Sequence, residues 1–77
     1  MVNYMKTFLK VWFSSDGGDP SDITSRLVGM GFKPTTGGYD YVYIWKRMPT
    51  IDDLVEFAEQ VQQTLKGTGI YFKLETQ

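Results

Sequence analysis

Residues 39–47 of the chain read YDYVYIWKR, with an aromatic side chain at every second position up to Trp45. Side chains of a β-strand alternate between its two faces, so this stretch predicts a strand with all of its aromatics on one side. The aliphatic residues between them, Val42 and Ile44, then stand on the other side, which we expect to be the core side. Large aromatics displayed away from a core are typical of a binding surface, because monomeric proteins rarely expose broad apolar patches.

Two other stretches show the same alternation. Residues 4–13 place one set on the expected core face (Met5, Thr7, Leu9, Val11, Phe13) and another on the outer face (Tyr4, Lys6, Phe8, Lys10, Trp12). Residues 70–75 place Ile70, Phe72 and Leu74 inward and Tyr71, Lys73 and Glu75 outward. Both patterns predict strands whose outer faces mix aromatic and charged residues.

Two helices are predicted between these strands. The first begins after Asp19 as N-cap, has Pro20 at its first position and ends at Gly31. The second begins after Thr50 and ends before Gly67. Its apolar residues recur at three- and four-residue spacing and form one stripe: Ile51, Leu54, Val55, Phe57, Ala58, Val61 and Leu65.

Residues 32–36 are predicted to form a short edge strand, because Pro34 cannot donate a ladder hydrogen bond. Gly37 and Gly38 then form a hairpin turn into residues 39–47. The predicted fold is therefore α+β, a ferredoxin-like split βαβ with the element order β-α-β-β-α-β, in a single domain of residues 1–77. Right-handed crossovers give an antiparallel sheet in the order 4-1-3-2, with both helices on one face. Without a strand at residues 32–36, the fold would be a three-stranded βαβαβ.

The charges divide between the two predicted layers, although the whole chain has a formal net charge of only −1. The predicted strands carry six cations and two acids, a balance of +4: Lys6, Lys10, Lys33, Lys46, Arg47 and Lys73 against Asp40 and Glu75. The helices and loops carry seven acids and two cations, a balance of −5. We therefore expect a basic sheet side and an acidic helix side.

The sequence offers few residues for catalysis or metal binding, because it contains no cysteine and no histidine. These residues supply the commonest metal ligands and the commonest general base at neutral pH. We expect no enzymatic activity, no metal site and no cofactor. No stretch approaches the roughly 20 apolar residues that span a bilayer, and no signal peptide is evident at the start, so we expect no membrane partner and a cytoplasmic location.

The face without helices is the predicted binding surface. Aromatics interleaved with cations suit a single-stranded nucleic acid, because each base stacks on a ring for roughly 1–3 kcal/mol while Lys and Arg contact phosphates. The predicted binding residues are Phe8, Lys10, Trp12, Tyr39, Tyr41, Tyr43, Trp45, Arg47, Tyr71 and Lys73.

Residues 38–42, Gly-Tyr-Asp-Tyr-Val, resemble part of the third-strand signature of the RNA-recognition motif, a family with the same element order. The resemblance implies that Tyr39 and Tyr41 stack on bases, with Trp12 in the stacking role on the first strand. The chain departs from the family pattern at Gly37, Asp40 and Ile44, where the family has a cation, a small residue and an aromatic.

Other uses of the same face remain open at the level of sequence. A second copy of the chain or another protein would bury the aromatics, since Tyr, Trp and Arg are enriched at protein interfaces too. The cations between the aromatics favour a nucleic acid, whereas the negative net charge favours a homodimer or a protein partner. A small-molecule site and a purely structural sheet are further readings. Asp40 has the parity of Val42, and we expect it at the open end of the sheet, within reach of water.

Overall fold

The computed structural model describes residues 5–13, 17 and 19–77. Its elements in chain order are β1 (Lys6–Trp12), α1 (Pro20–Met30), β2 (Lys33–Pro34), β3 (Tyr41–Ile44), α2 (Ile51–Leu65) and β4 (Tyr71–Thr76). The strands form one antiparallel sheet in the order β2-β3-β1-β4. The α+β class, the strand order and the antiparallel pairing are therefore confirmed. The predicted start of the first strand, Tyr4, lies outside the described residues.

Both helices begin and end where their capping residues indicate. The Asp19 carboxylate accepts the Ser21 N–H at 2.9 Å, and this bond lowers the pKa of Asp19. Gly31 ends α1 at φ 108°, a left-handed conformation in which glycine has no steric penalty. At the start of α2, Thr50 Oγ1 accepts the Asp53 N–H while the Asp53 carboxylate accepts the Thr50 N–H, which completes a capping box.

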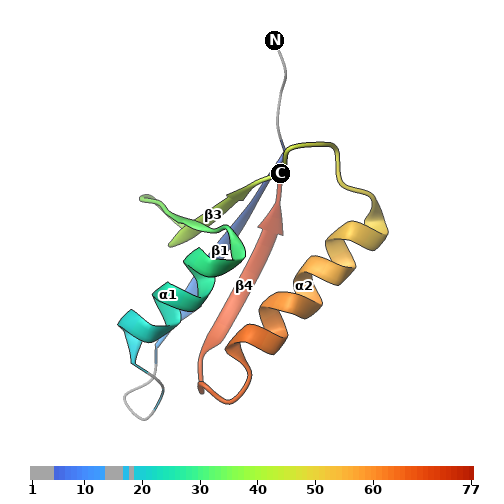
Figure 1. Cartoon of the computed structure of the whole chain (residues 1–77). Coiled ribbons are helices and arrows are strands. Elements are labelled where there is room, and N and C mark those ends of the chain that lie inside the picture. The colour runs from blue at the N-terminus through green and yellow to red at the C-terminus, as the bar shows by residue number, and fades with distance from the viewer. Residues whose placement is uncertain (1–4, 14–16, 18) are drawn as a thin grey trace.

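One hydrophobic core lies between the sheet and the two helices, which cover the same face of the sheet (Figure 1). From the helices it buries Ile23 and Leu27 of α1 and Phe57, Val61 and Leu65 of α2. From β1 it buries alternate residues, Thr7, Leu9 and Val11, as predicted. The predicted stripe of α2 is only partly buried, because Ile51 and Val55 are 79% and 53% exposed.

The second strand exists but is short. It contains only Lys33 and Pro34, which lie opposite Val42 and Tyr41 at the edge of the sheet. The edge position predicted from Pro34 is confirmed. Phe32, just before this strand, is 1% exposed, so the segment is held by a buried ring rather than by a long ladder.

The predicted orientation of β3 is wrong. Tyr41 and Trp45 are buried on the helix side, and Tyr43 packs against the same core, whereas Val42 and Ile44 point to the open side. The register agrees, since Tyr41 lies opposite the buried Leu9 and Val42 lies opposite Phe8.

Ring packing accounts for this orientation. The Tyr43 and Trp45 rings lie 4.6 and 5.2 Å from the Phe57 ring of α2, measured between centroids. The Phe57 ring of α2 therefore presents an aromatic partner on the helix side of β3, in the space between the two layers. Aromatics fill that space and remove more apolar area from water than Val or Ile would.

The polar tips of the buried aromatics all have partners. Trp45 Nε1–H donates to Thr7 Oγ1 at 2.8 Å, and Thr7 Oγ1 lies 2.8 Å from Thr76 Oγ1 on β4. The Tyr41 hydroxyl bonds to Thr24 Oγ1 of α1 at 2.6 Å. Because these groups are satisfied, burial of the aromatics carries no penalty for an unpaired donor.

Candidate nucleic-acid interface

The open face of the sheet is the side that the two helices leave uncovered, and register defines its rows. Phe8 of β1 lies between Val42 of β3 and Glu75 of β4. Lys10 lies opposite Lys73, and Trp12 lies opposite Tyr71. The described residues of this face are Lys6, Phe8, Lys10, Trp12, Lys33, Tyr39, Val42, Ile44, Tyr71, Lys73 and Glu75. Four lysines and one glutamate make the face basic, as predicted for the sheet side.

An aromatic and cationic cluster lies at the end of this face formed by β1 and β4. Trp12 is 47% exposed and Tyr71 is 77% exposed. The Lys10 ammonium lies 5.6 Å from the centre of the Trp12 ring and donates to the Gly38 carbonyl at 3.3 Å. Lys10 and Lys73 are directly opposite across the ladder, an arrangement that costs stability because like charges on paired strands repel. A bound anion would relieve that repulsion.

Tyr39 also belongs to the open face, although its spacing from Tyr41 predicts the same side for both. Its ring centroid lies 5.0 Å from that of Phe8. The Asp40 N–H donates to the Leu9 carbonyl at 2.9 Å, and Tyr41 is also the register partner of Leu9. Asp40 and Tyr41 thus both lie opposite Leu9, as in a β-bulge. The extra residue puts Tyr39 and Tyr41 on opposite faces of the sheet.

Asp40 fixes this bulge with its side chain. Its carboxylate accepts the Val11 N–H at 2.9 Å, in place of a backbone carbonyl that β3 does not supply. Asp40 is partly exposed, as expected for a residue at the open end of the sheet. Its hydrogen bond therefore accounts for its presence without a catalytic role.

Arg47 is directed toward the helices instead of toward the open face. Its guanidinium lies 3.0 Å from the Asp53 carboxylate in the first turn of α2. The Thr50 N–H lowers the pKa of Asp53, and Arg47 adds a smaller effect in the same direction. Arg47, Tyr41, Tyr43 and Trp45 are therefore separated from the open face, which retains Phe8, Lys10, Trp12, Tyr39, Tyr71 and Lys73 of the predicted set.

Val42 and Ile44 are the members of this face that the sequence pattern assigned to the core. A signal for the correct orientation lies in Thr7, whose hydroxyl falls on the core face of a central strand. On the core face, Val42 or Ile44 would make no polar contact with the Thr7 hydroxyl, whereas Trp45 donates to it in addition to its bond with Thr76 of β4.

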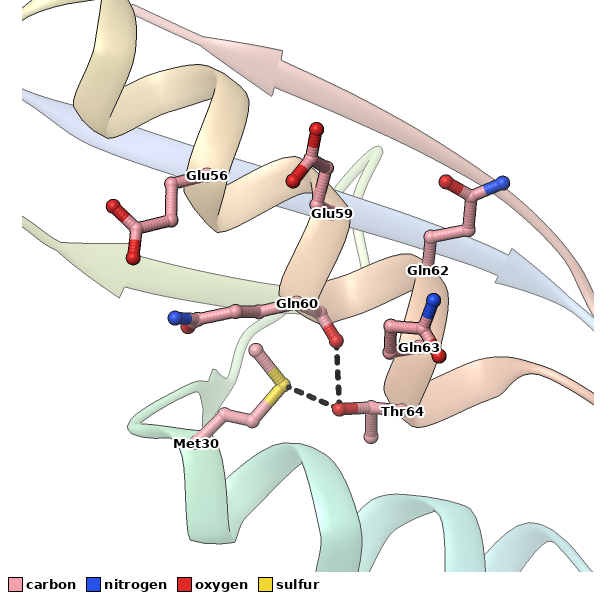
Figure 2. A pocket seen from close by; sticks show the side chains of 7 residues that line it. All are labelled: Met30, Glu56, Glu59, Gln60, Gln62, Gln63 and Thr64. Atoms are coloured by element: carbon pink, nitrogen blue, oxygen red, sulfur yellow. Dashed lines mark hydrogen bonds between the residues drawn. The ribbon is translucent and has the colours of Figure 1, made fainter.

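A hollow of about 790 Å³ lies elsewhere, beside α2 and the end of α1. It is lined by Met30, Glu56, Glu59, Gln60, Gln62, Gln63 and Thr64 (Figure 2). The Thr64 hydroxyl turns toward the Met30 sulfur at 3.2 Å, while Glu56 and Glu59 point in different directions from the helix (Figure 2). These side chains do not converge on a common point, so the hollow has no arrangement suited to a charged ligand.

Among residues 5–13, 17 and 19–77, no three acidic, histidine or cysteine side chains form a group that could hold a metal ion. Within the same part of the chain, no helix has the length and apolar character needed to cross a membrane.

Comparisons with protein-family models, with curated proteins and with solved structures found no match for this chain. Residues 38–42 resemble the RNA-recognition motif through two aromatic positions, Tyr39 and Tyr41. Tyr41 is only 6% exposed and bonds to Thr24, so it is not available to stack on a base.

Proposed function

We propose that the chain is a single-domain, ferredoxin-like binding module that holds single-stranded nucleic acid on the open face of its sheet and performs no chemistry. The observation that carries this proposal is the pairing of Lys10 with Lys73 beside the pairing of Trp12 with Tyr71. The proposal keeps the cytoplasmic location expected from the sequence.

In this proposal, bases stack on the exposed rings of Trp12 and Tyr71, and phosphates lie against Lys10 and Lys73. Stacking contributes roughly 1–3 kcal/mol per base and tolerates any sequence, because every base has a π-face. Phe8 and Tyr39 extend the aromatic surface along β1. In this proposal the stacking surface lies mainly over β1 and β4. The sequence had also assigned Tyr41, Tyr43 and Trp45, next to β1, to that surface.

The first test is titration of the protein with short single-stranded oligonucleotides at several salt concentrations. Binding should weaken with salt, with a slope of about −0.7 per phosphate contact in a log–log plot. Lys10→Ala and Lys73→Ala should each reduce that slope by about 0.7, whereas Arg26→Ala on α1, whose guanidinium pairs with Asp22 in the helix layer, should leave it unchanged. Absence of binding at low salt, or equal slopes for all three variants, contradicts the proposal.

Tryptophan fluorescence supplies an independent readout. Trp12 is exposed on the face and Trp45 is buried behind it. In a Trp45→Phe variant only Trp12 remains, and stacking of a base should quench its emission. In a Trp12→Phe variant, binding should leave the emission of Trp45 almost unchanged. Quenching of Trp45 alone would place the ligand on the wrong side of the sheet.

A second candidate, a protein partner or a second copy covering the open face, is favoured by Ile44. Ile44 is 41% exposed and Val42 lies beside it on the same face. Such an interface should be weakened by Ile44→Lys, which leaves the cluster around Trp12 intact. If Ile44→Lys abolishes self-association while oligonucleotides fail to bind, this second function replaces the first.

A further inference from the structure

The two edges of the sheet differ sharply. At one edge, β2 has two residues and contains Pro34, which cannot donate to another strand. At the other edge, β4 has six residues, Tyr71–Thr76, with no proline among them. A strand of this kind offers a row of free backbone groups, and natural proteins usually shorten it, cover it or pair it.

The hydrogen bonds to β1 show which groups of β4 are free. Lys6 and Gln77 exchange two backbone hydrogen bonds of 2.9 Å, so they form a hydrogen-bonded pair of the ladder. Antiparallel pairing alternates, and Tyr71, Lys73 and Glu75 therefore also turn their backbone groups toward β1. Phe72, Leu74 and Thr76 turn theirs toward the free edge.

We propose that β4 pairs antiparallel with β4 of a second copy of this chain, in the register that places Leu74 opposite Leu74 of that copy. This register matches free groups with free groups: Leu74 with Leu74, and Phe72 with Thr76 in both directions. The two sheets become one sheet of eight strands, whose open face stays uncovered. The proposal therefore holds whether or not that face binds nucleic acid.

Charge selects both the occupant and the register. With Leu74 on the two-fold axis, Lys73 of each copy lies opposite Glu75 of the other, on the open face. A shift of the register by two residues in either direction places Lys73 against Lys73 or Glu75 against Glu75, and like charges at paired positions repel. Among the described residues, neither Lys73 nor Glu75 forms an ion pair within one copy. The second copy also brings a carboxylate to Lys73, which otherwise faces only Lys10 across the ladder.

The exposed part of α2 lies on the same side of the molecule as the β4 edge. Ile51 and Val55 share a stripe with Gln62, which follows them at helical spacing. Gln62 lines a hollow of about 390 Å³ together with Phe72 of β4, and α2 runs beside β4 in Figure 1. Pairing across β4 brings the two α2 stripes to one side of the joined sheet, where they can cover each other.

The test is a charge swap read by sedimentation equilibrium from micromolar to millimolar protein at low salt. The natural chain should be a dimer, and Glu75→Lys or Lys73→Glu alone should weaken dimerisation at least about ten-fold, because each creates two like-charge pairs. The double variant Lys73→Glu/Glu75→Lys restores opposite charges and should restore the dimer. Lys33→Glu, on the β2 edge, is the matched control and should dimerise like the natural chain.

Hydrogen exchange shows whether the two copies pair along the β4 edge. In the dimer, the amides of Leu74, Phe72 and Thr76 should become protected, while those of Lys73 and Glu75 are protected in monomer and dimer alike. A chain that is monomeric over the whole range overturns the proposal. A dimer also overturns it if neither Glu75→Lys nor Lys73→Glu weakens dimerisation and the Leu74 amide stays unprotected, since that dimer uses another surface. Oligonucleotide binding is scored separately, so its failure leaves this result unaffected.

Discussion

Tyr41 and Trp45 on the helix side of the sheet are 6% and 9% exposed, whereas Trp12 and Tyr71 on its open side are 47% and 77% exposed. Both pairs come from stretches of sequence with alternating patterns, so residue type alone does not separate them. Hydrogen bonding does. The buried pair has its polar tips bonded to Thr24 and Thr7, while no such bond is found for Trp12 or Tyr71 among the described residues. In this protein, a threonine across the layer or on the next strand accompanies each buried aromatic tip.

The largest test of this comparison replaces one tryptophan on each side. Trp45→Ala should lower the free energy of unfolding by about 3–5 kcal/mol, because it leaves a cavity beside Phe57. Trp12→Ala should change it by less than about 1 kcal/mol, since half of that side chain is already in water. Urea unfolding measures both values. Similar losses in the two variants would show that the open face is part of the structural core.

A smaller effect is expected at Thr7, the hydroxyl shared by Trp45 and Thr76. Thr7→Val keeps the shape of the side chain but leaves the Trp45 N–H buried without an acceptor, which should cost about 1–3 kcal/mol. Combining Thr7→Val with Trp45→Phe removes both partners, and the combined loss should be smaller than the sum of the single losses. Additive losses in this cycle would mean that the two residues act independently.

Two tyrosine hydroxyls give the next comparison. Tyr41→Phe removes the bond to Thr24 Oγ1 between β3 and α1 and should cost about 0.5–1.5 kcal/mol. Tyr71→Phe removes a hydroxyl from a side chain that is 77% exposed and should leave the midpoint of urea unfolding unchanged. Equal shifts of the two midpoints would contradict the assignment of Tyr41 to the core.

The smallest effect concerns Asp53, which draws Arg47 to the helix side. Its pKa is lowered below 3.8, chiefly by the Thr50 N–H, so its charged form stabilises the folded state above that pH. That contribution is lost as pH falls through the lowered pKa. Asp53→Asn should therefore be less stable than the natural chain at neutral pH, and the difference should shrink in acid. Asp52→Asn changes the same charge in the same turn without a bond to Thr50 and should show a smaller difference.

Much of the fold follows from local chemistry and was predictable. The caps at Asp19, Gly31 and Thr50 define both helices, because they satisfy terminal backbone groups within a few residues. Pro34 defines an edge strand for a similarly local reason. The candidate site was predicted less well. The residues contributed by β1 and β4 lie on the expected face, whereas three of the aromatics contributed by residues 39–45 do not.

The sequence by itself determined that β3 has an aromatic side and an aliphatic side, since alternation is a property of any strand. Only the tertiary structure decided which side is buried. That choice depends on partners far along the chain: Phe57 to pack the rings, Thr7 and Thr24 to satisfy their polar tips, and the bulge at Asp40 to turn Tyr39 outward. The alternation within residues 39–47 contains no information about those contacts, because each of them joins this stretch to another helix or strand.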